Sequence, residues 1–141
     1  QTGADRAFFG EKDYQQLLVI KRMAHDLDIT TAIEGVETVR EDDGLALSSR
    51  NIYLSKEERQ AAPLLYKTLM AVAQRIRDGN DISAQEIWGQ EELLNAGFSS
   101  VDYFSVLDAE TLQPGLDTSR VRRVLAAAKL GRTRLIDNVQ A

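Results

Sequence analysis

The segment Phe9-Gly10-Glu11-Lys12-Asp13 combines residue types that suit a phosphate-binding turn. Its glycine follows a short apolar run and comes just before an amphipathic segment. A glycine there lets the backbone approach a ligand closely, and the free amides of a helix N-terminus favour a phosphate. Lys12 adds a full positive charge. The pattern alone also fits a plain strand-to-helix turn with a solvated lysine, so both interpretations stay open.

A second polar stretch, Leu47-Ser48-Ser49-Arg50-Asn51, follows an acidic turn. Two hydroxyls beside a guanidinium offer several donors to phosphate oxygens, and arginine can bind such oxygens bidentately. On a loop at a domain junction, these groups could close over a nucleotide. A polar linker whose serines cap turns explains the stretch equally well.

Two further polar residues lie in or near the helix expected after Asp13. Gln16 falls in its first turn, where a neutral amide can orient a hydroxyl or carboxylate without adding charge. A surface glutamine is the plainer interpretation of this residue. His25 lies near the helix end and is assigned no catalytic role.

The first 40 residues predict a parallel strand–helix–strand unit. Ala7–Phe9 is typical of the end of a buried strand, and residues 14–27 carry apolar positions at helical spacing. Asp13 is the expected N-cap of that helix, and residues 31–39 predict a second strand. Such a βαβ unit cannot bury both faces of its sheet, so we expect the tail of a larger α/β domain.

The middle of the chain predicts two helices after a polar boundary near residue 45. Each helix begins with a capping box, Ser55 with Glu58 and Ser83 with Glu86. Pro63 is expected to kink or divide the first helix, because proline removes a helical donor.

Three strand-like runs close the chain: Val101–Leu107, Val121–Ala128 and Arg134–Val139. Gly131-Arg132-Thr133 is short enough for a hairpin turn. The arginines before and within the second run are interpreted as a solvated strand edge rather than an anion site; they are Arg120, Arg122 and Arg123. The second half is therefore expected to be an α+β domain with helices on a three-stranded antiparallel sheet, and the expected domains are 1–45 and 46–141.

Composition limits the function classes. The 141 residues carry a net charge of −5, which argues against binding to nucleic acid or to an anionic membrane. The chain has no cysteine and one histidine, so a disulfide framework, a thiolate site and a His-rich zinc site are excluded. The sequence has no signal peptide or membrane-length apolar run, and a cytoplasmic location is expected. A start at Gln1 favours a fragment.

Three segments together resemble the pantothenate synthetase family, in order and with family-like spacing. They are Phe9-Gly10-Glu11-Lys12-Asp13-Tyr14-Gln15-Gln16-Leu17, then Asp43-Gly44-Leu45-Ala46-Leu47-Ser48-Ser49-Arg50-Asn51-Ile52-Tyr53-Leu54, then Leu130-Gly131-Arg132-Thr133-Arg134-Leu135-Ile136-Asp137-Asn138. The resemblance covers nearly the whole chain. It implies that residues 1–45 are the remnant of a Rossmann-like nucleotidyl-transferase domain that binds ATP and pantoate. Residues 46–141 would form the C-terminal lid.

The resemblance implies ATP-dependent ligation of pantoate to β-alanine through pantoyl adenylate, with AMP and pyrophosphate as products. ATP would be used with Mg²⁺, because its phosphates need that cation, and no metal site is expected in the protein itself. The full-length parent would be a homodimer with small-molecule partners.

Site residues follow from the same resemblance, residue by residue. The implied ATP-binding set is Gly10, Glu11, Lys12, Asp13, Val39, Leu47, Ser48, Ser49 and Arg50. Lys12 and Arg50 would be the catalytic pair, which binds the phosphates as pyrophosphate leaves. Asp13 would lie near the ribose, Gln16 would hold pantoate, and Val39 would contact the adenine region. Residues 47–50 resemble the family's version of the mobile KMSKS loop.

Two departures from the family are expected to matter. Glu37 stands where many relatives carry proline, and the chain lacks the family's N-terminal half with its His-x-Gly-His motif. The 141-residue chain is therefore expected to be inactive alone. Two other functions remain open: a fragment of another adenylate-forming transferase, such as an aminoacyl-tRNA synthetase, and a non-catalytic interaction domain.

Overall fold

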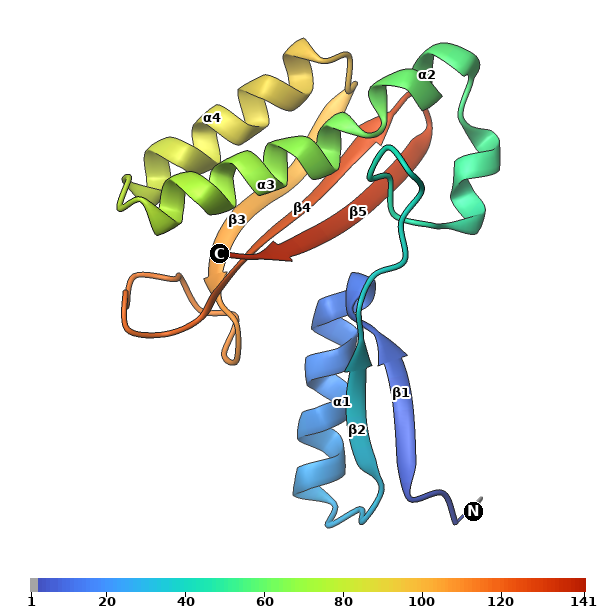
Figure 1. The fold of residues 1–141 in the computed structure, drawn as a ribbon, viewed down its shortest axis with the longest axis vertical. Coiled ribbons are helices and arrows are strands. Elements are labelled where there is room, and N and C mark those ends of the chain that lie inside the picture. The colour runs from blue at the N-terminus through green and yellow to red at the C-terminus, as the bar shows by residue number, and fades with distance from the viewer. Residues whose placement is uncertain (1–2) are drawn as a thin grey trace. The chain divides into compact units, whose positions relative to one another are not determined.

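The computed structural model describes residues 3–141, which form two compact units that divide between Val39 and Arg40. The first contains β1 (Arg6–Gly10), the 3₁₀ turn η1 (Glu11–Asp13), α1 (Tyr14–Asp26) and β2 (Ala32–Val36). The strands β1 and β2 pair in parallel, as Figure 1 shows for the blue and teal arrows. The predicted βαβ arrangement is thus confirmed.

The first unit has a small core of its own. In the part of it that the structure describes, Leu17 and Ala24 are the buried apolar residues. Phe8 on β1 and Val19 on α1 are 61% and 66% exposed. Little apolar surface is therefore removed from water within this unit, and its contribution to stability by burial is small.

The second unit is larger and has an α+β architecture. Its helices are η2 (Ser49–Tyr53), α2 (Lys56–Ala61), α3 (Leu64–Arg77) and α4 (Ile82–Asn95), and its strands are β3 (Ser100–Asp108), β4 (Arg122–Leu130) and β5 (Thr133–Gln140). The strands form one antiparallel sheet in the order β3-β4-β5, with α3 and α4 across it (Figure 1). The predicted fold class is confirmed, and the core lies between these two helices and the sheet.

Apolar spacing on both sides builds that core. On α3, Leu65, Leu69, Val72 and Ile76 are at most 2% exposed, and they recur at the spacing of one helix face. On β4, every second residue from Val124 to Leu130 joins the same cluster, because alternate side chains of a strand share one face.

Local signals at the first helix pair are confirmed. Pro63 ends α2 and occupies the N-cap position of α3, where its missing N–H costs no helical hydrogen bond. The Ser55–Glu58 capping box is formed in both directions, with distances of 3.1 Å and 2.9 Å.

The second predicted capping box is wrong. Asp81, two residues before Ser83, caps α4 through a 2.8 Å hydrogen bond from the Ala84 amide. A carboxylate competes well for these free amides because it also interacts with the helix dipole. Glu86 instead accepts a 2.7 Å hydrogen bond from the Val106 amide on β3, which ties α4 to the sheet.

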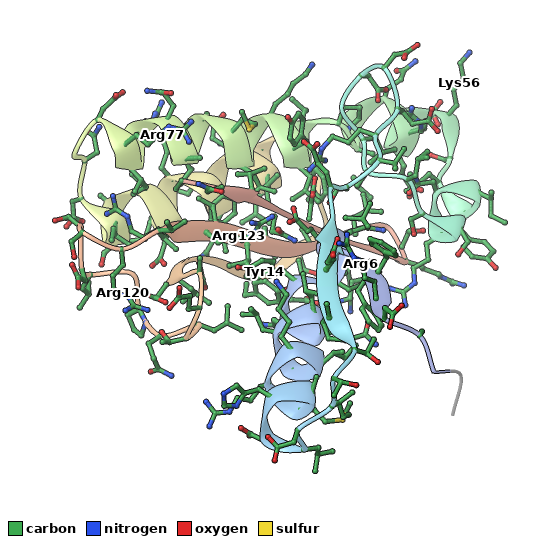
Figure 2. The ribbon with its side chains drawn as sticks, turned by 60° about the horizontal axis from the view of Figure 1, so that its bottom comes forward. Arg6, Tyr14, Lys56, Arg77, Arg120 and Arg123 are labelled. Carbon is green, nitrogen blue, oxygen red and sulfur yellow. The ribbon has the colours of Figure 1, made fainter. Side chains whose placement is uncertain are left out.

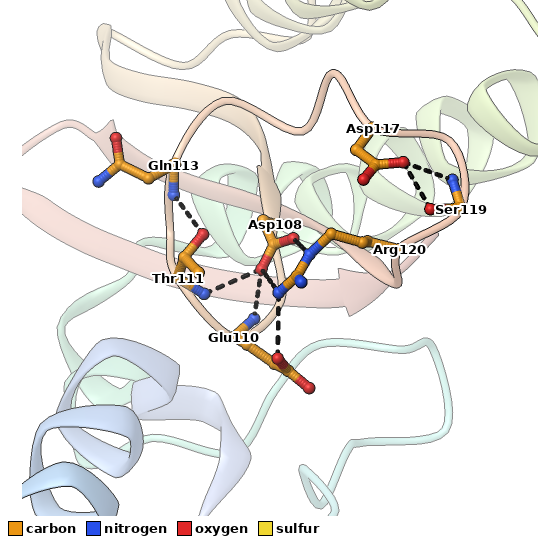
Figure 3. Close-up of polar contacts among 7 residues, drawn as sticks. All are labelled: Asp108, Glu110, Thr111, Gln113, Asp117, Ser119 and Arg120. Atoms are coloured by element: carbon orange, nitrogen blue, oxygen red, sulfur yellow. Dashed lines mark hydrogen bonds and ion pairs between the residues drawn. The ribbon is translucent and has the colours of Figure 1, made fainter.

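The predicted strand edge at the arginine cluster is also wrong, because β4 is the central strand of its sheet. Arg120 closes the loop between β3 and β4 by pairing with Asp108 and, at 3.0 Å, with Glu110 (Figure 3). Asp108 also accepts 2.9 Å hydrogen bonds from the Glu110 and Thr111 amides. The Arg120 side chain, followed by these amides, holds the pKa of Asp108 well below its usual range.

The unit boundary lies earlier in the chain than the expected division at residue 45. Arg40 is the first residue of the second unit and pairs there with Asp137 of β5. Leu45 and Ala46 are each 4% exposed, so both are packed inside this unit rather than in a linker. The physical reason for the shift is therefore burial of the short hairpin that begins at Arg40.

Candidate functional site

The first candidate segment runs from the end of β1 into the first turn of α1. Gly10 has φ −66°, so an L-residue could adopt its backbone conformation. A Cβ added at Gly10 would meet no atom within 4 Å, which means that the space beside its Cα is open. Glycine here leaves room for the close approach of a ligand and is not needed to relieve backbone strain.

The charged residues after Gly10 have different environments. Asp13 occupies the N-cap position of α1, as predicted, but its exposed side chain makes no capping hydrogen bond. Glu11 is half-buried, and its carboxylate lies against Gly35 of β2, 3.1 Å from where a Cβ of that glycine would be. Lys12 is half-buried on η1. The space beside Gly10 is thus open, while the Glu11 carboxylate packs against the sheet.

The remaining residues expected in the first unit are solvent-exposed. Gln16 lies in the first turn of α1 and is exposed. Val39 is 64% exposed and follows β2 at the end of this unit. His25, the one histidine of the sequence, is exposed, and its Nδ1 lies 3.2 Å from a carboxylate oxygen of Asp26.

The second candidate segment forms the start of η2. Ser48 is the N-cap residue of this short helix, and its hydroxyl accepts a 3.3 Å hydrogen bond from the Arg50 amide. Ser49 and Arg50 are exposed, and Leu47 is 46% exposed. The hydroxyl of Ser49 and the guanidinium of Arg50 are therefore presented to solvent at the front of the segment, where an anion can reach them.

A side-chain amide holds this segment in place. Asn51 donates a 3.1 Å hydrogen bond to the carbonyl of Ala46, and its backbone amide donates to the carbonyl of Ser48 at 3.1 Å. Ala46 in turn bridges to Arg40 across a short hairpin. The loop that carries Ser48, Ser49 and Arg50 is thus joined to the hairpin behind it.

The hairpin itself is anchored by an ion pair that the sequence analysis missed. Arg40 donates two hydrogen bonds to Asp137, of 2.6 Å and 2.9 Å, and a third to the carbonyl of Gly44 at 3.1 Å. Its guanidinium also lies 3.9 Å from the centre of the Tyr66 ring. A charged residue at a buried strand position, as at Asp137, is the signal that could have predicted a partner.

A second ion pair supports the other side of the same hairpin. Asp43 pairs with Arg59 of α2 at 2.6 Å and accepts a 3.2 Å hydrogen bond from the Leu45 amide. The Arg59 side chain is the main cause of the lowered pKa of Asp43, and the carboxylate raises the pKa of Arg59 in return. Both side chains are more than a third exposed, so this pair contributes little to stability.

The sequence-predicted residues therefore fall into two groups. Residues 10–16 and Val39 belong to the first unit, and residues 47–50 belong to the second. Residues 10–16 are contiguous in the first unit, Val39 lies apart from them at the end of that unit, and residues 47–50 are contiguous in the second. The backbone amides, hydroxyls and cations of both groups are suited to binding and charge stabilisation.

Residues 3–141 contain no group of three or more His, Cys, Asp or Glu side chains placed to hold a metal ion. None of the helices in that range has the length and apolar character needed to span a bilayer.

Comparison with known proteins decides the family. A family profile described as Pantoate-beta-alanine ligase matches residues 1–140. The chain belongs to the pantoate-beta-alanine ligase family. Among the relatives of this chain, the pantothenate synthetase of Paramagnetospirillum magneticum is 54% identical over 138 residues, which cover 96% of the chain and 48% of the relative. The pantothenate synthetase of Rhodopseudomonas palustris strain BisA53 is 52% identical, with 99% and 49% covered.

Solved ligase structures agree with the fold. The crystal structure of pantothenate synthetase from Thermus thermophilus matches with a TM-score of 0.87 and 46% identity, and covers 96% of this chain and 49% of that one. A pantoate-beta-alanine ligase from Francisella tularensis, solved with beta-gamma ATP and beta-alanine, matches with a TM-score of 0.68, 28% identity and coverage of 96% and 43%. The chain spans about half the length of the curated relatives it matches.

Proposed function

We propose that this chain supplies phosphate- and pantoate-binding residues of a ligase that joins pantoate to β-alanine with ATP. The observation that carries the proposal is the family match over residues 1–140, because it includes both polar segments. The Francisella tularensis relative in complex with beta-gamma ATP and beta-alanine supports ATP and β-alanine as substrates.

The proposed reaction has two steps. The carboxylate of pantoate attacks the α-phosphorus of ATP, and pyrophosphate leaves with its electron pair, which gives pantoyl adenylate. The amine of β-alanine then attacks the acyl carbon, AMP leaves and the amine loses a proton. The first step needs alignment and charge stabilisation more than a protein nucleophile, which suits two segments that carry backbone amides, hydroxyls and cations.

Each segment has its own role in this proposal. Lys12 and Arg50 neutralise charge on the departing pyrophosphate, while Ser48 and Ser49 donate to phosphate oxygens. Gln16 holds pantoate through its neutral amide. The backbone from Gly10 to Asp13, including the main chain of Glu11, lies along the nucleotide. Asp13 is closest to the ribose.

Two apolar residues complete the proposed set of ATP-binding residues. Val39 contacts the adenine region, and Leu47 belongs to the loop that covers the phosphates. Mg²⁺ enters with ATP as part of the substrate complex. We expect the full-length parent to be a homodimer.

Ligase activity of the 141-residue chain by itself can be tested directly. Since the chain spans about half of its relatives, we expect no turnover from the 141 residues by themselves. The assay measures AMP release from ATP that depends on both pantoate and β-alanine. A full-length relative serves as the positive control, and turnover by the 141-residue chain at a comparable rate would contradict the expectation.

A further inference from the structure

A hollow of about 910 Å³ lies within the second unit, beside the loop that carries Arg50. Its lining comes from two places in the chain: the end of η2 with the start of α2, and the turn between β4 and β5. The lining residues are Arg50, Tyr53, Leu54, Ser55, Glu58, Gly131, Arg132, Thr133 and Arg134. All the residues that line the hollow belong to the second unit. On its β4–β5 side the sequence predicts only a hairpin turn.

Two of its three arginines have unpaired charges. Arg134 is paired with Asp102 at 2.7 Å. Within residues 3–141, the structure records no ion pair for Arg50 or for Arg132, and both are exposed. Glu58 is the single acidic residue in the lining, and its carboxylate already accepts the 2.9 Å hydrogen bond of the capping box. The hollow thus has an excess of positive charge in a chain whose net charge is −5.

The turn that carries Arg132 is held in a defined position. Gly131 has φ +56°, and a Cβ there would collide with the carboxylate of Glu58, so α2 packs closely against the turn. Ser99 Oγ lies within hydrogen-bonding distance of the carbonyls of Lys129 and Gly131, at 3.0 Å and 3.2 Å. Thr133 is 7% exposed and pairs with Leu130 across the turn. A cation on such a turn loses less conformational freedom when it binds a ligand.

We propose that this hollow binds the diphosphate end of the nucleotide, with Arg132 as a second phosphate-binding cation beside Arg50. The inference rests on the proposed function, which assigns Arg50 but not Arg132 to the phosphates. Two guanidinium groups that face one hollow can each donate two parallel hydrogen bonds to adjacent phosphate oxygens. A diphosphate carries enough charge to use both arginines, whereas the single phosphate of AMP is satisfied by one.

Lys56 helps to define which cations belong to the site. It is the first residue of α2, directly after Ser55, but its side chain points away into solvent (Figure 2) and does not line the hollow. A cation next to a lining residue in the sequence is therefore not necessarily part of the site. Arg132, which is far from Lys56 in the sequence, does line the hollow.

The test is calorimetric titration of the 141-residue chain with sodium pyrophosphate at constant ionic strength. We expect Arg132→Ala and Arg50→Ala each to weaken pyrophosphate binding by about tenfold or more, the size of one lost charge-assisted contact. Lys67→Ala is the matched control, because Lys67 is an exposed cation on α3 outside the hollow and its loss changes the net charge equally. AMP is the second probe, and its affinity is expected to change less than about twofold in Arg132→Ala.

Amide chemical shifts locate the ligand independently of affinity. Pyrophosphate is expected to shift the Gly131, Arg132 and Thr133 amide signals in the unchanged protein. If Arg132→Ala binds pyrophosphate as tightly as Lys67→Ala does, the inference is overturned, and a loss confined to Arg50→Ala leaves the proposed function standing. No binding of pyrophosphate to the unchanged chain, with no shifts at the turn, overturns the inference as well. Weakening in Arg132→Ala with shifts at the turn supports it.

Discussion

Arg40 and Asp137, which are 97 residues apart in the chain, form a bidentate ion pair with distances of 2.6 Å and 2.9 Å. The side chains are 18% and 2% exposed, so the pair is largely removed from water. Arg40 begins the hairpin that leads to the Ser48–Arg50 loop, and Asp137 lies on β5. The pair therefore connects the candidate phosphate loop to the sheet of the second unit.

Asp137→Asn is expected to destabilise the protein by about 3 kcal/mol, because removal of one partner leaves Arg40 with an uncompensated, mostly buried charge. Urea unfolding at pH 7 measures the change. Asp43→Asn is the matched control, since it breaks the exposed Asp43–Arg59 pair on the other side of the same hairpin. Its expected cost is below about 1 kcal/mol, and equal costs for the two variants would refute the assignment of Arg40–Asp137 as the anchor.

Gly10→Ala and Gly131→Ala are expected to separate binding from stability. Gly10 has φ −66° with open space at its Cβ position, so alanine there should change the free energy of unfolding by no more than about 0.5 kcal/mol. It should nevertheless weaken ATP binding, because the methyl group fills the space that the ligand needs. Gly131→Ala meets both a φ of +56° and the Glu58 carboxylate, and should cost at least about 1 kcal/mol.

Denaturant titrations on both glycine variants and ATP calorimetry on Gly10→Ala measure these effects. An ATP affinity of Gly10→Ala equal to that of the unchanged chain would argue that no ligand approaches this backbone. A destabilised Gly10→Ala would show that the space beside Gly10 is not open.

Part of the loss of folding stability at low pH is expected to come from protonation of Asp108. Its hydrogen bonds from Arg120 and the loop amides lower its pKa in the folded state, so the unfolded chain binds more protons in acid. The stabilisation is complete above the ordinary aspartate pKa and is lost as the pH falls through the folded value. Asp108→Asn should therefore flatten the dependence of the urea midpoint on pH between about 5 and 2.

Asp42→Asn controls for the general effect of removing one acidic charge, because Asp42 is exposed on the acidic turn before Gly44 and makes no ion pair within residues 3–141. Its pH profile should run parallel to that of the unchanged chain. A profile of Asp108→Asn that is also parallel would mean that the loop network contributes nothing to acid sensitivity.

Local sequence signals predicted helix boundaries correctly where a single residue or capping pair determines the boundary. Pro63 divides two helices because proline removes a donor, and Ser55 with Glu58 forms its box because no better cap lies nearby. The box at Ser83 failed because Asp81 competes for the same helix start. The parallel pairing of β1 with β2 followed from the order strand, helix, strand.

Sequence reasoning also found the two polar segments, because a glycine before a helix and a Ser-Ser-Arg run are local patterns. It did not find the contacts that hold or extend them. Asp137 contacts Arg40, and Arg132 lines the hollow with Arg50, because the pairing of β4 with β5 places these residues near distant parts of the chain. Such contacts join residues far apart in the chain, so spacing along the sequence carries no signal for them.

Binding of the ATP phosphates by cations of this chain is tested most directly at Arg50, which is exposed. Calorimetric titration with ATP and Mg²⁺ should detect binding to the unchanged chain and to Lys67→Ala, and Arg50→Ala should weaken it by about tenfold or more. Arg50→Lys should recover part of the loss, because it restores the charge but not the planar pair of donors. Equal ATP binding by the unchanged chain and Arg50→Ala, or no ATP binding by either, would contradict the account.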